Sequence, residues 1–183
     1  MPTEIDVQTS PVELSKPEKL NKFHDVSEFD CGEATINDFL HKKARKAQEN
    51  KHSVVYVSCF KGTNIVAGYY TLSAGSVVRE NVIPKSYQRN SPTVHPVTIL
   101  GRMGVTVAAQ GYGYSVDLLQ DAIRRCIVAS EDIAISAILV HPLNDRLADF
   151  YAKEAGFQRC PDLSPLTMML SLRQLKNLDD GNF

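Results

Sequence analysis

The sequence predicts an α/β fold with a single hydrophobic core, and three observations support this prediction. The chain has 183 residues, of which 43% are hydrophobic, so it is long and apolar enough for one domain. Segments rich in β-branched residues alternate with amphipathic helical patterns, in the order helix, hairpin, strand, helix, strand, helix, strand. A glycine-containing break at residues 110–115 joins a strand directly to a helix.

A helix and a β-hairpin make up the first half of the predicted domain. The helix is expected to begin at Asp30, a helix-capping residue type, with Glu33 at capping-box spacing. Residues 53–60 and 65–78 are rich in β-branched and aromatic side chains and predict two paired strands. Residues 61–64 form the predicted turn between them.

Strands and helices alternate in the second half, after a proline-punctuated loop at residues 79–96. The apolar segments that predict strands are 97–107, 133–141, 157–159 and 166–171. Helical periodicity predicts helices at 115–130 and 145–155. Gly156 is expected to end the second of these helices as a left-handed cap.

Both ends of the chain are predicted to be flexible tails, at residues 1–18 and 176–183, so the folded domain is expected to span residues 19–175. Residues 1–17 lack a signal-peptide core, and no apolar run approaches the ~20 residues that cross a bilayer. These features predict a cytoplasmic protein with no membrane association.

Charge and cysteine content narrow the function classes. The formal net charge of -1 argues against a surface that is basic throughout, although it leaves room for a local basic patch. None of the four cysteines lies in a CxxC pair or at zinc-ligand spacing from a histidine. They predict reduced thiols, and no metal site is expected.

Residues 110–115, Gln-Gly-Tyr-Gly-Tyr-Ser, carry the clearest chemical signal. Two glycines at a strand-to-helix junction allow a tight turn whose N–H groups point outward. The helix N-terminus adds positive partial charge, so the segment suits a pyrophosphate. It is not a Walker A loop, because the Gly-Lys-Ser/Thr ending is missing, and Val116 breaks the dinucleotide pattern GxGxxG.

The same segment resembles the Q/R-x-x-G-x-G/A motif of the GNAT acetyltransferase superfamily. Gln110 and Gly113 match, while Ser115 stands where Gly or Ala is usual. Residues 144–157 resemble a second GNAT pattern, N-x-x-A-x-x-F-Y-x-K-x-G-F, with Leu147 in place of Ala and one extra residue before the glycine. The residues that match the second pattern are Asn144, Phe150, Tyr151, Lys153, Gly156 and Phe157.

Within the superfamily, the chain resembles the acetyltransferase toxins of type II toxin–antitoxin pairs over residues 20–172. The segments that carry this likeness are FDCGEATINDFL, VAGYYTLSAGSV, ILGRMGV and VHPLNDRLADFYAKEAGF. The resemblance implies a GNAT fold, in which a mixed, mostly antiparallel sheet is splayed at its central strands and flanked by helices. It also implies acetylation of the α-amine of aminoacyl-tRNA, which blocks translation, a ribbon-helix-helix antitoxin as partner, and a homodimer.

The resemblance also implies where acetyl-CoA binds. The pantetheine arm would pair with the strand at residues 97–107 where it parts from residues 133–141, and the glycine segment would hold the pyrophosphate. A backbone N–H within residues 105–107 would stabilise the oxyanion. The implied acetyl-CoA-binding residues are Met103, Val105, Val107, Gln110, Gly111, Tyr112, Gly113, Tyr114, Ser115, Asn144 and Phe150.

Tyr151 occupies the position that carries the general acid in the family. A phenol has a pKa near ~10, close to that of a thiol, so it can return a proton to the leaving thiolate. Without the motif match, Tyr151 would be interpreted as a half-buried aromatic residue on an amphipathic helix. The match favours the catalytic interpretation.

The acceptor amine is also constrained by the sequence. Residues 97–107 contain no Asp or Glu that could deprotonate a lysine, whose pKa is ~10.4, whereas an α-amine (~7.7–8) is already partly neutral. Basic residues could contact tRNA phosphates, or they could only form solvated surfaces. The candidates for tRNA contact are Lys42, Arg45, Lys46, Arg79, Arg89 and Arg102.

Two other functions stay open at this point. The chain could acetylate a protein N-terminus or a small amine such as a polyamine or an antibiotic, although no acidic cluster suited to a polyamine surrounds the two motifs. Alternatively, it could be a non-catalytic module that binds acetyl-CoA. Ser115 slightly favours that module, whereas the matches at Gln110, Gly113, Asn144 and Tyr151 argue against it.

Overall fold

The computed structural model describes residues 10–179 and contains a seven-stranded sheet in the order β1-β2-β3-β4-β5-β7-β6. The strands are β1 (Glu18–Lys19), β2 (Val54–Cys59), β3 (Val66–Val78), β4 (Val94–Val105), β5 (Ala137–Val140), β6 (Gln158–Arg159) and β7 (Met168–Ser171). The helices are α1 (Ala34–Lys42), α2 (Ala44–Glu49), α3 (Tyr114–Asp132), α4 (Asp145–Ala155) and α5 (Leu172–Asp179), with short 3₁₀ turns η1 (Arg79–Asn81), η2 (Lys85–Gln88) and η3 (Val107–Ala109). The predicted α/β class is confirmed.

The sheet parts between its central strands, as the family resemblance implied. Strands β4 and β5 are parallel and pair from Val97 with Ala137 to Leu100 with Val140, and the other pairs of named strands are antiparallel. Beyond Leu100, β4 continues to Val105 with β3 as its partner and no pairing to β5. One edge of residues 101–105 is therefore open to hydrogen bonding by another extended chain.

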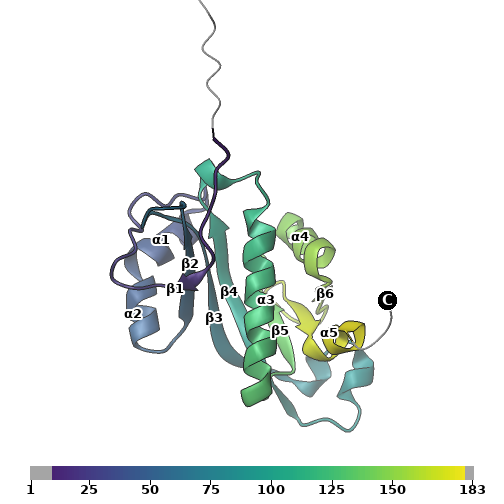
Figure 1. Ribbon diagram of the computed structural model, residues 1–183. Coiled ribbons are helices and arrows are strands. Elements are labelled where there is room, and N and C mark those ends of the chain that lie inside the picture. The colour runs from purple at the N-terminus through teal and green to yellow at the C-terminus, as the bar shows by residue number, and fades with distance from the viewer. Residues whose placement is uncertain (1–9, 180–183) are drawn as a thin grey trace, which may run out of the picture.

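Helices cover both faces of the sheet (Figure 1). On one face, α3 packs closely on β3, because a Cβ at Gly68 would lie 3.1 Å from the Leu118 side chain. On the opposite face, Phe39 and Leu40 of α1 pack on Tyr69 in a separate apolar cluster. The loop between β3 and β4 covers the rest of that face through a third cluster, which includes Val82.

The first helix begins later than predicted. The capping box is wrong, because α1 starts after Glu33, whose side chain makes no capping hydrogen bond. The Asp30 carboxylate instead accepts the N–H of Gly32 at 2.9 Å and the Asn37 amide at 2.7 Å. These hydrogen bonds lower the pKa of Asp30, and the bond from the Gly32 N–H has the largest effect. The aspartate thus orders the loop before the helix and does not cap the helix.

The described parts of the predicted tails lie on the body of the protein. Ser15 donates its N–H to the Cys59 carbonyl at 2.8 Å, and the Tyr114 hydroxyl donates to the Val12 carbonyl at 2.5 Å. Residues 172–179 form α5, a helix that the sequence pattern did not predict. Residues 1–9 and 180–183 lie outside the described residues, and the domain limits stay a prediction.

A buried ionic cluster fixes α3 to the sheet and to the N-terminal segment. Asp121, 5% exposed, accepts the Tyr70 hydroxyl at 2.6 Å and Arg125 Nε at 2.8 Å, and it also pairs with Arg124. Arg125 donates to the Pro17 carbonyl at 2.8 Å. Burial opposes ionisation of Asp121, but these hydrogen bonds and charges more than offset it, so the pKa of Asp121 is lowered.

An Asp121→Asn variant is therefore expected to unfold at a lower temperature at pH 7. Removing one partner of a buried ionic cluster costs about 3 kcal/mol, which is on the order of 10 °C in Tm for a chain of this size. The pKa of Asp121 is lower in the folded state than the unfolded value of ~3.9, so the ionised carboxylate stabilises the fold above that pH. This stabilisation is lost as Asp121 becomes protonated, so the difference in Tm between the variant and the unmodified protein should close as the pH falls below about 4. Thermal melts across pH test this, with Asp162→Asn, an exposed carboxylate outside the helices, as the control.

Candidate active site

The glycine segment forms an open turn that leads into α3. Gly111 and Gly113 both have φ of +84°, and no atom lies within 4 Å of a Cβ placed at either position. Glycine is therefore needed for the backbone conformation and not for space. The N–H groups of residues 111–115 donate to no acceptor within residues 10–179, so they are available to an anion.

The Gln110 side chain forms hydrogen bonds at the end of β4. Its Nε2 donates to the carbonyl of Val105 at 2.9 Å and to that of Cys31 at 3.1 Å. The amide thus ties the glycine segment to the strand before it and to the loop before α1. This geometry gives Gln110 a positioning role, while the turn that follows supplies the free donors.

The backbone after β4 is mostly engaged within the protein. Thr106 donates its N–H to Ala67 at 2.7 Å, and Val107 donates to Asp30 at 2.8 Å. Neither N–H can serve as the oxyanion donor that was expected within residues 105–107. The donors that remain lie on the open edge of β4 before Thr106, where the pairing with β3 shifts register. Register irregularities of this kind are over-represented beside active sites.

Tyr151 lies on α4 with its ring buried and its hydroxyl at the surface. The residue is 9% exposed, and its ring contacts those of Phe150 and Phe157 at centroid distances of 5.4 and 5.6 Å. The Tyr151 hydroxyl makes no hydrogen bond to any described residue. Among the described side chains, Ser53 is the one whose polar atom is both unpaired and fully enclosed, so the unpaired Tyr151 hydroxyl is not fully enclosed and reaches solvent. Its proton is free for a bound group.

Both ends of α4 are fixed, which holds Tyr151 in place. The Asn144 side chain caps the helix by accepting the N–H of Leu147 at 3.0 Å. Gly156, with φ of +75°, ends it in the predicted left-handed conformation. Asn144 was expected to bind the cofactor, and its Oδ1 is used in this cap. The sequence predicted the helix bounds and the Gly156 cap, which are confirmed, but it did not predict the cap by Asn144.

Burial raises the pKa of Tyr151 to about 12. This is higher than the value of ~10 assumed from the sequence, so the phenol is a weaker acid than expected. The pKa of a thiol that leaves in an equally dehydrated cleft is raised in the same way. The buried thiols of Cys59, Cys126 and Cys160 illustrate the shift, because burial raises the pKa of each to about 11. Proton transfer from phenol to thiolate therefore stays close to balanced.

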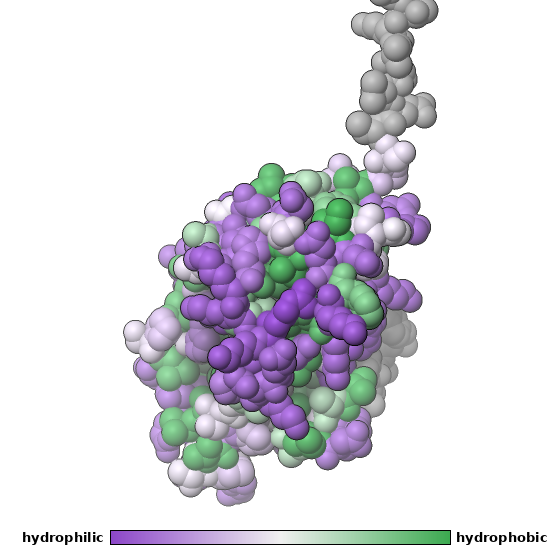
Figure 2. Space-filling model, turned by 90° about the vertical axis from the view of Figure 1, so that its left-hand side faces the viewer, coloured by the Kyte–Doolittle hydropathy of each residue, from purple (hydrophilic) through white to green (hydrophobic). Residues whose placement is uncertain are grey.

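The basic candidates for tRNA contact lie in three places, namely the α1–α2 surface, strand β4 and the loop between β3 and β4. The α1–α2 surface holds exposed Lys42 and Lys46, and Lys42 pairs with Asp38 at 2.8 Å. Figure 2 views this side of the molecule, where hydrophilic side chains gather. Arg45 lies there too but donates to the carbonyls of Asn21 and His24, so it holds the preceding loop.

Arg102 lies beside α1, and the other two arginines lie elsewhere. The Arg102 guanidinium stacks over the Phe39 ring at 4.2 Å, next to the open edge of β4. Phe39 was predicted only as an apolar helix position, and no sequence signal marked it as a platform for this arginine. Arg79, bonded to the Ser91 carbonyl at 3.1 Å, and exposed Arg89 lie in the loop at the far end of β4.

Comparison with known proteins identifies the family. No protein-family model matches the chain. A tRNA-acetylating toxin of Mycobacterium tuberculosis (strain ATCC 25618 / H37Rv) is 36% identical over 164 residues, which are 90% of this chain and 96% of the relative. The chain belongs to the tRNA-acetylating toxins. The GNAT fold and the toxin family predicted from the sequence are confirmed.

Two solved structures of this toxin family share the fold. AtaT complexed with acetyl-methionyl-tRNAfMet is 28% identical, has a TM-score of 0.84, and the match covers 91% of this chain and 99% of AtaT. A tyrosine-to-phenylalanine variant of AtaT, bound to the C-terminus of the antitoxin AtaR and to acetyl-CoA, is 25% identical with a TM-score of 0.75. That match covers 92% of this chain and 99% of the variant.

Proposed function

We propose that this toxin transfers the acetyl group of acetyl-CoA to the α-amine of aminoacyl-tRNA and so blocks translation. The observation that carries the proposal is the C-terminal end of β4 and the turn that follows it. An unpaired edge of β4 leads into a turn of free N–H groups at the start of α3. The Tyr151 hydroxyl supplies an unbonded proton from α4, which packs in the same apolar cluster as α3. The complex of AtaT with acetyl-methionyl-tRNAfMet supports this acceptor.

Each part of the arrangement suits one part of acetyl-CoA. The free N–H groups of residues 111–115 and the N-terminus of the 19-residue helix α3 would hold the pyrophosphate. The open edge at Met103 and Val105 would pair with the amides of pantetheine, as a strand pairs with a sheet edge. Tyr112, 55% exposed beside Tyr114, offers an aromatic surface at the rim of the turn.

The acceptor would approach from the face that carries α1 and α2. Arg102 lies on that side, at the point where β4 and β5 part. Residues 97–107 offer no carboxylate base, which suits an α-amine that is already partly neutral at pH 7. The α1–α2 surface would contact tRNA phosphates, because residues 34–51 hold five Lys and Arg against two acidic residues.

Several further features belong to the same proposal. The folded domain spans residues 19–175, the toxin forms a homodimer in the cytoplasm, and a ribbon-helix-helix antitoxin restrains it. The AtaT variant bound to the antitoxin AtaR supports an antitoxin partner. Within residues 10–179, no helix is both long and apolar enough to cross a membrane.

The test of the proposed function uses purified toxin, labelled acetyl-CoA, and bulk tRNA either charged with amino acids or stripped of them. We expect label in the charged pool alone, because only the charged pool carries an α-amine. Label in neither pool, with acetyl-CoA still bound, would contradict the proposal. In that case protein N-termini and small amines become the acceptors to assay.

Removing two lysines from the α1–α2 surface should weaken tRNA binding and leave acetyl-CoA binding unchanged. The variant Lys42→Gln, Lys46→Gln is expected to raise KM for charged tRNA several-fold at physiological salt. It should also reduce the slope of log K against log salt by about 1 to 2, because each phosphate contact contributes roughly one released ion. The variant Lys16→Gln, Lys85→Gln loses the same charge from exposed sites outside the α1–α2 surface and is the control. Equal effects of the two variants would exclude this surface.

A further inference from the structure

A cavity lies toward the opposite end of β4 from the proposed acetyl-CoA segment. Its volume is about 490 Å³, and it lies among the ends of β3, α3 and β7 and the starts of β4, β5 and α5. Pro96, near the start of β4, lines it, whereas the proposed acetyl-CoA segment follows Val105 at the other end of that strand. Val105 is nine positions along the strand from Pro96, which is roughly 30 Å at about 3.3 Å per residue. The nearest part of the proposed acetyl-CoA site, the open edge that begins at residue 101, is still roughly 16 Å along the strand from Pro96, so the cavity lies outside that site.

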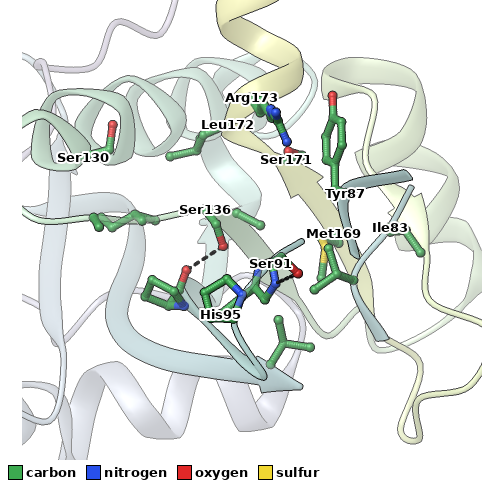
Figure 3. A pocket seen from close by; sticks show the side chains of 17 residues that line it. Ile83, Tyr87, Ser91, His95, Ser130, Ser136, Met169, Ser171, Leu172 and Arg173 are labelled. Carbon is green, nitrogen blue, oxygen red and sulfur yellow. Dashed lines mark hydrogen bonds between the residues drawn. The ribbon is translucent and has the colours of Figure 1, made fainter. Parts of the chain in front are cut away.

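Most of the cavity wall is apolar. Val77, Val82, Ile83, Met169 and Leu172 contribute side chains from β3, its following loop, β7 and α5. Both the size and this lining are typical of pockets that hold small organic molecules. The polar groups are few and lie on opposite sides, as Figure 3 shows for Arg173 and His95.

One side of the cavity is suited to an anion. The Arg173 guanidinium stacks over the Tyr87 ring at 4.8 Å, and no carboxylate lies within ion-pair distance of it among the described side chains. Ser171 is 4% exposed, and its hydroxyl has no partner in residues 10–179. The Ser171 hydroxyl is not fully enclosed by the protein, and Ser171 lines the cavity, so the hydroxyl faces the cavity. The N-terminus of α5 begins at the next residue and adds positive partial charge.

The opposite side presents a hydrogen-bond acceptor. His95, 7% exposed, places Nε2 at 2.9 Å from Ser91 Oγ (Figure 3). The single proton of the Ser91 hydroxyl is donated to the Gln88 carbonyl at 2.7 Å. Nε2 must therefore be the protonated nitrogen, and in the neutral ring Nδ1 is an acceptor with no donor in the described chain. Nδ1 is not fully enclosed, so it opens to the cavity.

We propose that this cavity binds an aromatic carboxylic acid that bears a hydroxyl or N–H group at the far end of its ring. The carboxylate pairs with Arg173 and the Ser171 hydroxyl. The ring packs among the apolar walls. The distal O–H or N–H donates to His95 Nδ1. This site is separate from acetyl transfer, and the inference does not rest on the proposed acceptor.

The test measures binding of 4-hydroxyphenylacetate to the full-length protein by calorimetry. Phenylacetate lacks the distal donor, and 4-hydroxyphenylacetamide lacks the charge. We expect saturable binding of the first compound, and binding of each analogue weaker by about tenfold, the effect of losing one hydrogen bond to a charged or buried group. No saturable binding of 4-hydroxyphenylacetate, or equal affinity for all three compounds, would overturn the proposal.

Variants locate the binding in the cavity. Arg173→Gln should weaken 4-hydroxyphenylacetate about tenfold and leave 4-hydroxyphenylacetamide unchanged, whereas Lys85→Gln, an exposed lysine of η2 outside the cavity, should change neither. Ala134→Phe adds a ring to an exposed lining residue and should abolish binding. Unchanged binding in both Arg173→Gln and Ala134→Phe would place the ligand elsewhere and refute the site. Acetyl-CoA binding, measured on the same samples, should stay at the wild-type level and reports that the variants are folded.

Discussion

A Tyr151→Phe variant is expected to bind acetyl-CoA as the unmodified protein does and to lose acetyl transfer by roughly 100- to 10,000-fold, the usual contribution of a general acid. The ring packs between Phe150 and Phe157, and phenylalanine preserves these contacts. The hydroxyl makes no hydrogen bond within residues 10–179, so its removal leaves no protein group unpaired. The loss should therefore appear in kcat and not in the acetyl-CoA dissociation constant.

The control for this variant is Tyr56→Phe. Tyr56 is also 9% exposed and lies in the same apolar cluster, but its ring stacks on Tyr70 at 5.1 Å and under Arg125 at 4.1 Å. It should keep full turnover, because Tyr56 lies on β2, which β3 separates from β4, and the open edge of β4 faces away from β3. Equal activity of Tyr151→Phe and the unmodified protein would remove Tyr151 as the acid.

The pH profile gives a second test of the same role. Since burial raises the pKa of Tyr151 to about 12, the phenol stays almost fully protonated through pH 10. Activity should rise with pH as the acceptor α-amine loses its proton near ~8, and it should show no decline near pH 10 from ionisation of Tyr151. A decline centred at pH 10 would indicate that burial does not raise the pKa of the catalytic acid.

Features set by neighbouring residues could be predicted from the sequence. The turn at Gly111 and Gly113 and the cap at Gly156 all have positive φ, and only glycine adopts this conformation readily. The mixed, mostly antiparallel sheet and the parting of its central strands came from the family resemblance, because periodicity does not reveal which strands pair. The resemblance covered nearly the whole chain, which explains why the fold was predicted so fully.

Features set by distant residues could not be predicted. Asp30 has the residue type and spacing of a helix cap, but its N–H and carbonyl pair with the Thr106 hydroxyl, 76 residues away, and its carboxylate turns to Gly32. The Gln110 amide binds Cys31, 79 residues away. The pKa of Tyr151 depends on packing that brings Phe157 against its ring. None of these contacts leaves a pattern in the local sequence.

Ser115 offers a way to separate acetyl-CoA binding from folding. The residue is the second of α3, where the proposed pyrophosphate would lie, and its side chain is half-buried. A Ser115→Asp variant is expected to bind acetyl-CoA about 100-fold more weakly, because two like charges roughly 4 Å apart near a protein surface repel by about 3 to 4 kcal/mol before screening by salt. Calorimetric titration with acetyl-CoA measures this loss.

The same substitution should raise or preserve thermal stability, because a carboxylate in the first turn of a helix interacts favourably with the helix dipole by about 0.3 to 1 kcal/mol. Weaker binding with an unchanged or higher Tm is the result expected if the ligand places an anion at this helix end. Ser115→Gly, the residue usual in the family, is the control and should bind acetyl-CoA at least as tightly as the unmodified protein. If Ser115→Asp binds acetyl-CoA normally, the pyrophosphate lies elsewhere, and the free N–H groups of residues 111–115 have another purpose.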